Sequence, residues 1–137
     1  MTRINCVPVE ELCNKHLMAE YRELPRLYSN LMKSLQIRGL EGTLNAIPDS
    51  YRLGKGHVLF FLDKFDFLRS RYETLVAELL IRGYNINEEL ANSVYVGLSD
   101  VPDEFFNNWC VSDSDMELNR NRIKERMPIN PKWELNK

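Results

Sequence analysis

The stretch HLMAEYRELPR, residues 16–26, holds the side chains that proton transfer and anion binding use. Glu23 is a carboxylate that can move protons or stabilise a cation, and Arg22 and Arg26 can bind phosphates. His16 adds a group that can donate or accept a proton near neutral pH. An active site would use these residue types, but so would an ordinary solvated helix face. The stretch alone leaves both interpretations open.

A stripe of apolar residues predicts the helix that positions these side chains. The apolar residues recur at alternating spacings of four and three, and we expect the helix to end at Gly39. On such a helix Arg22 and Arg26 fall opposite the stripe, whereas His16 and Glu23 fall on one flank. The stripe consists of Leu17, Tyr21, Leu24, Tyr28, Leu31 and Leu35.

Two features of this helix carry a free-energy cost. Arg22 and Arg26 repel each other by about a few tenths of a kcal/mol, which Glu20 and Glu23 would partly offset. Pro25 removes one backbone hydrogen bond from the helix interior and crowds the preceding turn. We therefore expect a kink at Pro25 that re-aims the residues around Glu23.

Two further helices are predicted beyond the first. An apolar stripe of the same spacing runs from Phe61 to Leu79 and is closed by Gly83. The third helix is predicted to begin at Ser114, where Ser-Asp-Met-Glu has the form of a capping box, and to reach about Met127.

Long connections, residues 39–56 and 83–112, separate these helices, and neither shows a persuasive strand pattern. The predicted fold class is therefore mostly α. We expect a compact single domain, residues 1–137, of three main helices joined by long loops.

The composition is that of an ordinary soluble globular protein, with 44% hydrophobic and 28% charged residues. No apolar run has the length of a membrane span, and the first ten residues are unlike a signal peptide. The three cysteines, Cys6, Cys13 and Cys110, are an odd number at no framework spacing. Reduced thiols in a cytoplasm fit this pattern better than a secreted scaffold.

The charges are unevenly distributed along the chain, although the net charge is only −2. Residues 73–118 hold one basic and ten acidic side chains, whereas residues 119–137 hold six basic and two acidic ones. Residues 1–72 are also basic, with eleven basic and eight acidic side chains. A basic binding face backed by an acidic one would give this pattern, although solvated charge runs are the commoner cause.

The first five residues, MTRIN, give the strongest indication of function. Together with HLMAEYRELPR, they resemble the pyrimidine-dimer DNA glycosylase and abasic-site lyase family, of the bacteriophage endonuclease V type. The resemblance covers nearly the whole chain and is weakest at residues 37–52, 87–97 and the C-terminus. It continues through Leu53–Val58, Phe60–Phe61, Asp63–Lys64, Glu78, Arg82–Ile86 and Ser99–Pro102.

The resemblance implies an enzyme that uses no metal and no cofactor. Its nucleophile is the α-amine left after removal of the initiator methionine, which in this chain belongs to Thr2. The amine would attack sugar C1′ of a damaged nucleotide and form a Schiff base, and β-elimination would then cleave the strand. Glu23 would stabilise the cationic intermediate and handle protons. An α-amine suits this role because its pKa, about 7.7–8.0, lies well below that of lysine.

The implied partner is damaged double-stranded DNA, and the implied oligomeric state is a monomer. The protein would act in the cytoplasm or on the nucleoid, and a viral gene could encode it. The implied DNA ligands are Arg3, Lys15, His16, Arg22, Arg26, Arg122 and Arg126. Two departures stand out. Lys15 replaces a glutamine of the phage member, and the residues after Trp133 lack its cluster of aromatics and lysine.

Other interpretations stay open. The same chemistry could act on another lesion, such as a ring-opened purine, or the chain could be a non-catalytic DNA-binding protein of this fold. The spacing of Cys13 and His16, with Cys6 nearby, resembles part of a metal site but lacks a second ligand pair. The loop Leu53–His57 fits no phosphate-binding fingerprint, and we expect its glycines to turn the chain into the second helix.

Overall fold

The computed structural model describes residues 4–134, and within them the fold is mostly α, as predicted. In that range the strand pairing is confined to an isolated bridge between Lys64 and Phe106. The helices are η1 (Val9–Glu11), α1 (Asn14–Glu23), α2 (Arg26–Ala46), α3 (His57–Phe60), α4 (Phe65–Ile81), α5 (Glu88–Ser99), η2 (Asp103–Phe105) and α6 (Asp113–Glu125).

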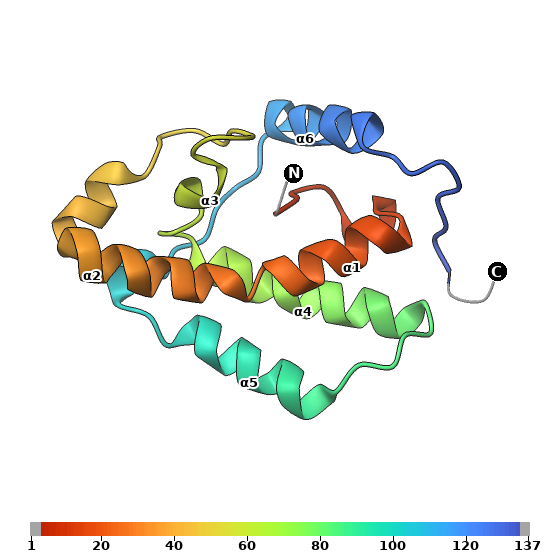
Figure 1. Ribbon diagram of the computed structural model, residues 1–137, viewed down its shortest axis with the longest axis horizontal. Coiled ribbons are helices and arrows are strands. Elements are labelled where there is room, and N and C mark those ends of the chain that lie inside the picture. Colours follow the sequence, from red (N-terminus) through yellow and green to blue (C-terminus); the bar gives the residue numbers. More distant parts are fainter. Residues whose placement is uncertain (1–3, 135–137) are drawn as a thin grey trace.

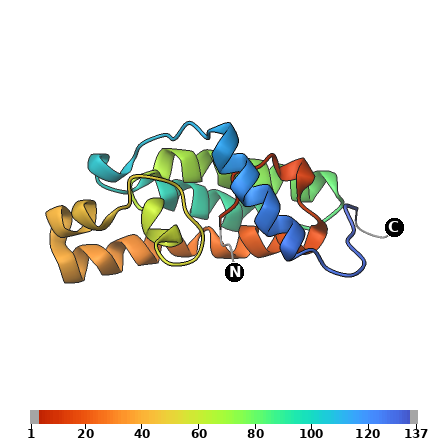
Figure 2. The ribbon, with the colours of Figure 1, turned by 90° about the horizontal axis from the view of Figure 1, so that it is seen from above.

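The helices form layers that place α6 and α5 on opposite sides of the molecule (Figure 1). A short segment, residues 4–7, passes between α6 and α1; we call it the arm. α1 packs on α4, and α4 packs on α5. Seen from above, α6 crosses α1 obliquely (Figure 2). The basic residues of the first and third predicted helices therefore come from neighbouring layers.

The core forms where the two predicted stripes meet. Leu17, Leu24 and Leu31 of the first stripe are buried, and so is every member of the second stripe. Tyr21 stacks on Tyr72 with ring centroids 5.7 Å apart, which joins α1 to α4. The apolar side of α1 is thus fixed, and its opposite side is left for the site.

The first predicted helix is observed as two helices, because Pro25 interrupts it. α1 ends at Glu23 and α2 begins at Arg26, while Leu24 and Pro25 keep right-handed helical dihedral angles. Proline has no N–H to donate to the carbonyl of Tyr21, so the hydrogen-bond ladder breaks here. The chain bends rather than turning back (Figure 1), and the expected kink beside Glu23 is present.

Gly39 also interrupts the helix, but it does not end it as predicted. Its φ of 76° lies in the left-handed region that favours glycine. The chain then resumes a helical course, and α2 runs to Ala46. The hydroxyls of Ser34 and Thr43, 2.9 Å apart and buried, join the two halves of α2. The first long loop is therefore shorter than predicted.

The second predicted helix begins later than its apolar stripe. α4 starts at Phe65, and the buried Phe61 belongs to a turn that follows the short helix α3. Gly56, with φ of 89°, is the residue just before α3, so the glycine-bearing loop does turn the chain into a helix. α4 ends two residues before Gly83, close to the predicted end.

α5 lies within residues 83–112, which the sequence wrongly suggested were an extended loop. Its buried residues are Ala91 and Leu98, whereas Leu90 and Val96 are 58% and 64% exposed. Because the buried face carries few large apolar side chains, no helical stripe was visible in the sequence.

α6 begins slightly earlier than predicted. Its N-cap is Ser112 rather than Ser114, and the capping box pairs Ser112 with Asp115. The Ser112 hydroxyl accepts a hydrogen bond from the Asp115 N–H at 3.1 Å, and the Asp115 carboxylate accepts one from the Ser112 N–H at 3.4 Å. The helix ends at Glu125, near the predicted end at Met127.

Candidate functional site

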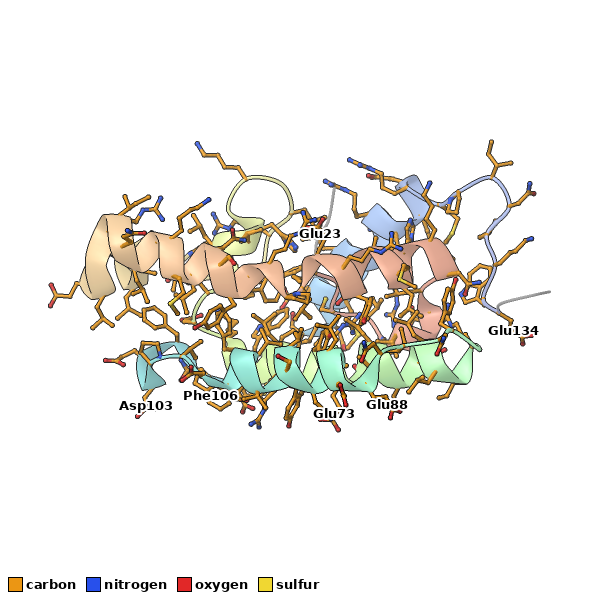
Figure 3. All side chains as sticks on the ribbon, turned by 60° about the horizontal axis from the view of Figure 1, so that its bottom comes forward. Glu23, Glu73, Glu88, Asp103, Phe106 and Glu134 are labelled. Atoms are coloured by element: carbon orange, nitrogen blue, oxygen red, sulfur yellow. The ribbon has the colours of Figure 1, made fainter. Side chains whose placement is uncertain are left out.

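Glu23 is the last residue of α1 and stands at the helix break (Figure 3). Its side chain is 20% exposed, and its Oε1 lies 3.3 Å from a guanidinium nitrogen of Arg26. Figure 3 also shows that Glu23 lies on the opposite side of the molecule from Glu73 and Glu88. The break thus leaves a largely covered carboxylate beside a cation, with part of its surface open to a substrate.

The exposed cations of α1 and α2 lie on one face. Lys15, Arg22 and Arg26 are all exposed. Arg22 and Arg26 follow Lys15 by seven and eleven residues, and residues at these spacings lie on the same side of a helix. As expected from the stripe, Arg22 and Arg26 point away from the core. This row of cations favours an anionic partner.

A hollow of about 240 Å³ lies between α1 and α6. Lys15 and His16 line it from α1, Arg122 and Arg126 from α6 and its C-cap, and Asn5 from the arm. Four residues predicted as DNA ligands therefore converge from opposite ends of the sequence. Three of them are cations, so the hollow suits a phosphate better than an apolar ligand.

His16 joins the two walls of this hollow. Its Nε2 donates a hydrogen bond to the backbone carbonyl of Arg126 at 3.1 Å. Its Nδ1 is then the accepting nitrogen, and it is buried with no hydrogen-bond partner among the described residues. A bound donor would find an acceptor there.

Thr2 and Arg3, predicted as the nucleophile and as a DNA ligand, lie outside the described residues. The arm that follows them is buried and held by backbone contacts. The N–H of Ile4 donates to Nε2 of His57 at 3.1 Å. Oδ1 of Asn119 accepts from the N–H groups of Cys6 and Val7 at 2.8 and 3.3 Å.

A buried ion pair completes the contacts of the arm. Arg71 donates to both carboxylate oxygens of Glu20, at 2.7 and 3.0 Å, and also to the carbonyl of Val7. Glu20 accepts a further hydrogen bond from the side chain of Asn5 at 2.9 Å. Glu20 is only 1% exposed, so the expectation that it offsets the exposed arginines of its own helix was wrong.

The residues that hold the arm are those that sequence reasoning missed. His57 and Asn119 carry no spacing signal. Arg71 does carry one, because it lies three residues after Leu68 and four before Leu75, on the buried face of α4. A cation at such a position implies a buried partner, since arginine is almost never fully buried alone.

The cysteines near α1 do not gather a metal-ligand set. Cys13 and His16 stand one turn apart, but no three His, Cys, Asp or Glu side chains converge within residues 4–134. Burial raises the pKa of the Cys6 thiol to about 11, so it stays protonated at neutral pH, whereas a metal ligand is a thiolate.

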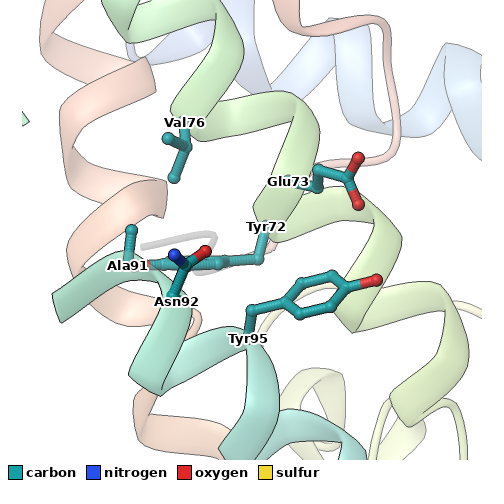
Figure 4. A pocket seen from close by; sticks show the side chains of 6 residues that line it. All are labelled: Tyr72, Glu73, Val76, Ala91, Asn92 and Tyr95. Atoms are coloured by element: carbon teal, nitrogen blue, oxygen red, sulfur yellow. The ribbon is translucent and has the colours of Figure 1, made fainter. Parts of the chain in front are cut away.

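A second hollow, of about 380 Å³, lies between α4 and α5 (Figure 4). Asn92 and Tyr95 line it from α5, opposite Tyr72 and Glu73 on α4. Its one charged lining side chain is the carboxylate of Glu73. It does not suit a phosphate, so the hollow between α1 and α6 is the better candidate site.

The fold and the site define a small helical protein that presents cations around a hollow and a carboxylate at a helix break, as expected of a nucleic-acid-processing enzyme. No helix in residues 4–134 is long and apolar enough to cross a membrane. A family model described as pyrimidine dimer DNA glycosylase matches residues 1–92, more than half of the chain. The chain belongs to that family, which confirms the family suspected from the sequence. It is therefore a DNA-repair enzyme whose substrate is DNA; Arg122 and Arg126 lie outside the matched residues.

Proposed function

We propose that this chain breaks a glycosidic bond of cyclobutane pyrimidine dimers and then cleaves the strand, through a Schiff base on the α-amine of Thr2. The observation that carries the proposal is the path of the arm. Asn5 contacts Glu20, which stands one turn before Glu23, about 4.5 Å along the axis of α1. Three residues of chain span at most about 10 Å, so an amine three residues before Asn5 is within reach of this part of α1.

The proposed reaction moves the sugar from the base to the amine. The uncharged amine donates its lone pair to C1′, the glycosidic bond breaks, and the base leaves with the bonding electrons and takes up a proton. A proton is then lost from nitrogen and the ring oxygen takes one up as the sugar ring opens, which gives a cationic imine. Loss of the C2′ proton then breaks the C3′–O bond, and the phosphate leaves. Every step is a proton or group transfer, so no oxidant or reductant is needed.

Glu23 supports the cationic stage of this reaction. A carboxylate close to the positive C1′–N group stabilises it electrostatically and can accept a proton. Arg3, Arg22 and Arg26 would favour the uncharged amine, because nearby positive charge opposes its protonation. Both effects require the amine to lie within reach of the helix break.

The proposed grip on DNA comes from two surfaces. The hollow is surrounded by Lys15, His16, Arg122 and Arg126, and Arg22 and Arg26 extend the row of cations along α1 and α2. Arg3, which follows Thr2 directly in the sequence, is the remaining proposed ligand. Such contacts position the duplex without reading its sequence. One copy of the chain carries every proposed residue, so we propose that a monomer acts on intracellular DNA.

Borohydride trapping tests the proposal, because reduction freezes an imine as a stable amine. We expect a covalent protein–DNA adduct with dimer-containing duplex and with abasic-site duplex, and very little with undamaged DNA. Peptide mapping should place the adduct on Thr2, with Met1 absent. Acetylation of the N-terminus should abolish trapping and leave DNA binding largely intact.

Three outcomes would change the assignment. An adduct on a lysine such as Lys15 would overturn the role of Thr2 and keep the lyase chemistry. An adduct that forms faster on ring-opened purines than on dimers would change the substrate. Binding to damaged DNA without any adduct would favour a non-catalytic protein of this fold.

A further inference from the structure

We propose that His57 and Asn119 are positioning residues for the amine chemistry: they hold the arm by its backbone N–H groups, from two different elements. This inference rests on the proposed function, because it concerns where the amine of Thr2 is delivered. Neither residue lies among the predicted DNA ligands, and both are buried, at 3% and 0% exposure.

The hydrogen bonds of His57 fix its tautomer. The N–H of Ile4 is a donor, so Nε2 has to be the unprotonated nitrogen, and Nδ1 then carries the proton. Nδ1 lies 2.9 Å from the backbone carbonyl of Arg52 and donates to it. His57 thus connects the loop before α3 to the first described residue of the chain.

The sequence places His57 at this point by a tight turn. Gly54 and Gly56 both have positive φ, at 69° and 89°, and the N–H of His57 donates to the carbonyl of Gly54 at 3.1 Å. Phe61 packs edge-on against the imidazole, with centroids 5.3 Å apart. The ring is therefore held in place by the loop and by the aromatic core.

Asn119 holds the other end of the arm. Its Oδ1 accepts from the N–H groups of Cys6 and Val7, and its Nδ2 donates to Oδ1 of Asn5 at 2.8 Å. One side chain thus satisfies three polar groups of the arm.

The place of Asn119 on α6 links the arm to the DNA-binding residues. Arg122 and Arg126 follow it by three and seven residues, so all three share one side of the helix. The helix proposed to bind phosphates is thereby the helix that holds the arm. The rigid helix α6 would thus position both the DNA and the nucleophile. Such rigidity suits a reaction whose rate falls when the reacting atoms are displaced by about 1 Å.

Two substitutions at His57 separate positioning from folding. In His57→Gln, the amide oxygen lies near the position of Nε2 and can still accept the hydrogen bond from the N–H of Ile4. In His57→Asn, the shorter side chain places its amide NH₂ near the position of Nδ1 and can keep only the hydrogen bond to the carbonyl of Arg52. Each loses one hydrogen bond and the aromatic ring, so His57→Gln and His57→Asn should lower the melting temperature to a similar extent.

Their reaction rates should differ. With enzyme in excess over abasic-site duplex, we expect borohydride trapping by His57→Asn to be at least about tenfold slower than wild type, and by His57→Gln to be within about threefold. Affinity for duplex with a reduced abasic site should be the same for all three proteins, because the proposed phosphate ligands are unchanged.

Asn119→Ala gives a second measurement, with Asn121→Ala as its control. Asn121 is exposed on the same helix, two residues further on. We expect slower trapping at unchanged affinity for Asn119→Ala, and wild-type values for Asn121→Ala.

The outcomes separate this inference from the proposed function. A wild-type protein that gives no adduct overturns the proposed function and this inference with it. A wild-type adduct with equal trapping rates for both His57 variants and for Asn119→Ala overturns the inference alone. If DNA affinity falls together with the trapping rate in these variants, the inference is also overturned, because His57 and Asn119 would then serve general folding.

Discussion

The side of the molecule between α1 and α6 and the side between α4 and α5 differ in what they bury. Around the arm the buried side chains include Asn5, Glu20, Arg71 and Asn119, and each is hydrogen-bonded to another of them or to the arm backbone. The residues that α5 buries, by contrast, are Ala91 and Leu98, which are apolar.

The two sides also differ in charge and in their hollows. The hollow between α1 and α6 is lined by three cations, and the hollow between α4 and α5 by a single carboxylate. Apolar contacts stabilise a fold but are non-directional, whereas hydrogen bonds fix atoms at defined distances. Buried polar groups lower stability unless they are paired. In this chain, paired buried polar groups therefore occur around the arm, where they hold a backbone segment in one position.

The largest expected effect is at Glu23. Glu23→Gln removes the carboxylate proposed to stabilise the imine and to handle protons, and we expect strand cleavage to fall by about 10²–10⁴-fold. Circular dichroism and affinity for damaged duplex should be unchanged. Glu73→Gln, on the side of α4 and α5, is the matched control and should cleave at the wild-type rate. Loss of helical signal along with activity would instead make Glu23 a structural residue.

The second prediction concerns the buried ion pair. Arg71→Met leaves the charge of Glu20 buried and unpaired, so the free energy of unfolding should fall by about 3–5 kcal/mol in urea titrations. Arg69→Met is the control: its ion pair with Asp66 is about one-third exposed on both partners, and we expect about 1 kcal/mol or less. Equal losses at both positions would remove the contrast between the buried network and the surface.

The difference between the two sides also explains what the sequence could and could not predict. The stripes at Leu17–Leu35 and Phe61–Leu79 were visible because burial against a core repeats every three or four residues, and the break at Pro25 follows from a missing N–H. α5 was missed because its buried face carries few large apolar side chains, while Leu90 and Val96 are exposed. The arm was missed because its contacts join residues far apart in the chain, such as Cys6 and Asn119, and no local pattern encodes such a contact.

The third prediction tests the row of cations. Arg22→Gln and Arg26→Gln should each weaken binding to damaged duplex and reduce the slope of log affinity against log salt by about 0.9, the value for one phosphate contact. Lys132→Gln, which is exposed but outside the row, should change neither. Equal changes at all three positions would indicate diffuse attraction rather than a defined face.

The smallest expected effect is at an exposed ion pair on the side of α6. Arg120 donates to both carboxylate oxygens of Glu11, at 2.8 and 2.7 Å, and this hydrogen bonding lowers the pKa of Glu11. A carboxyl group whose pKa is lowered on folding stabilises the fold above its unfolded pKa of about 4.3, and this contribution is lost as the pH falls through the folded pKa. The two side chains are 44% and 39% exposed, so solvent screens the pair.

Glu11→Gln should therefore lower the melting temperature only slightly at pH 7, and the difference from wild type should disappear as the pH falls below about 4. A large difference at pH 7, or one that persists unchanged in acid, would show that exposed charges also hold this side together and would weaken the contrast with its buried network.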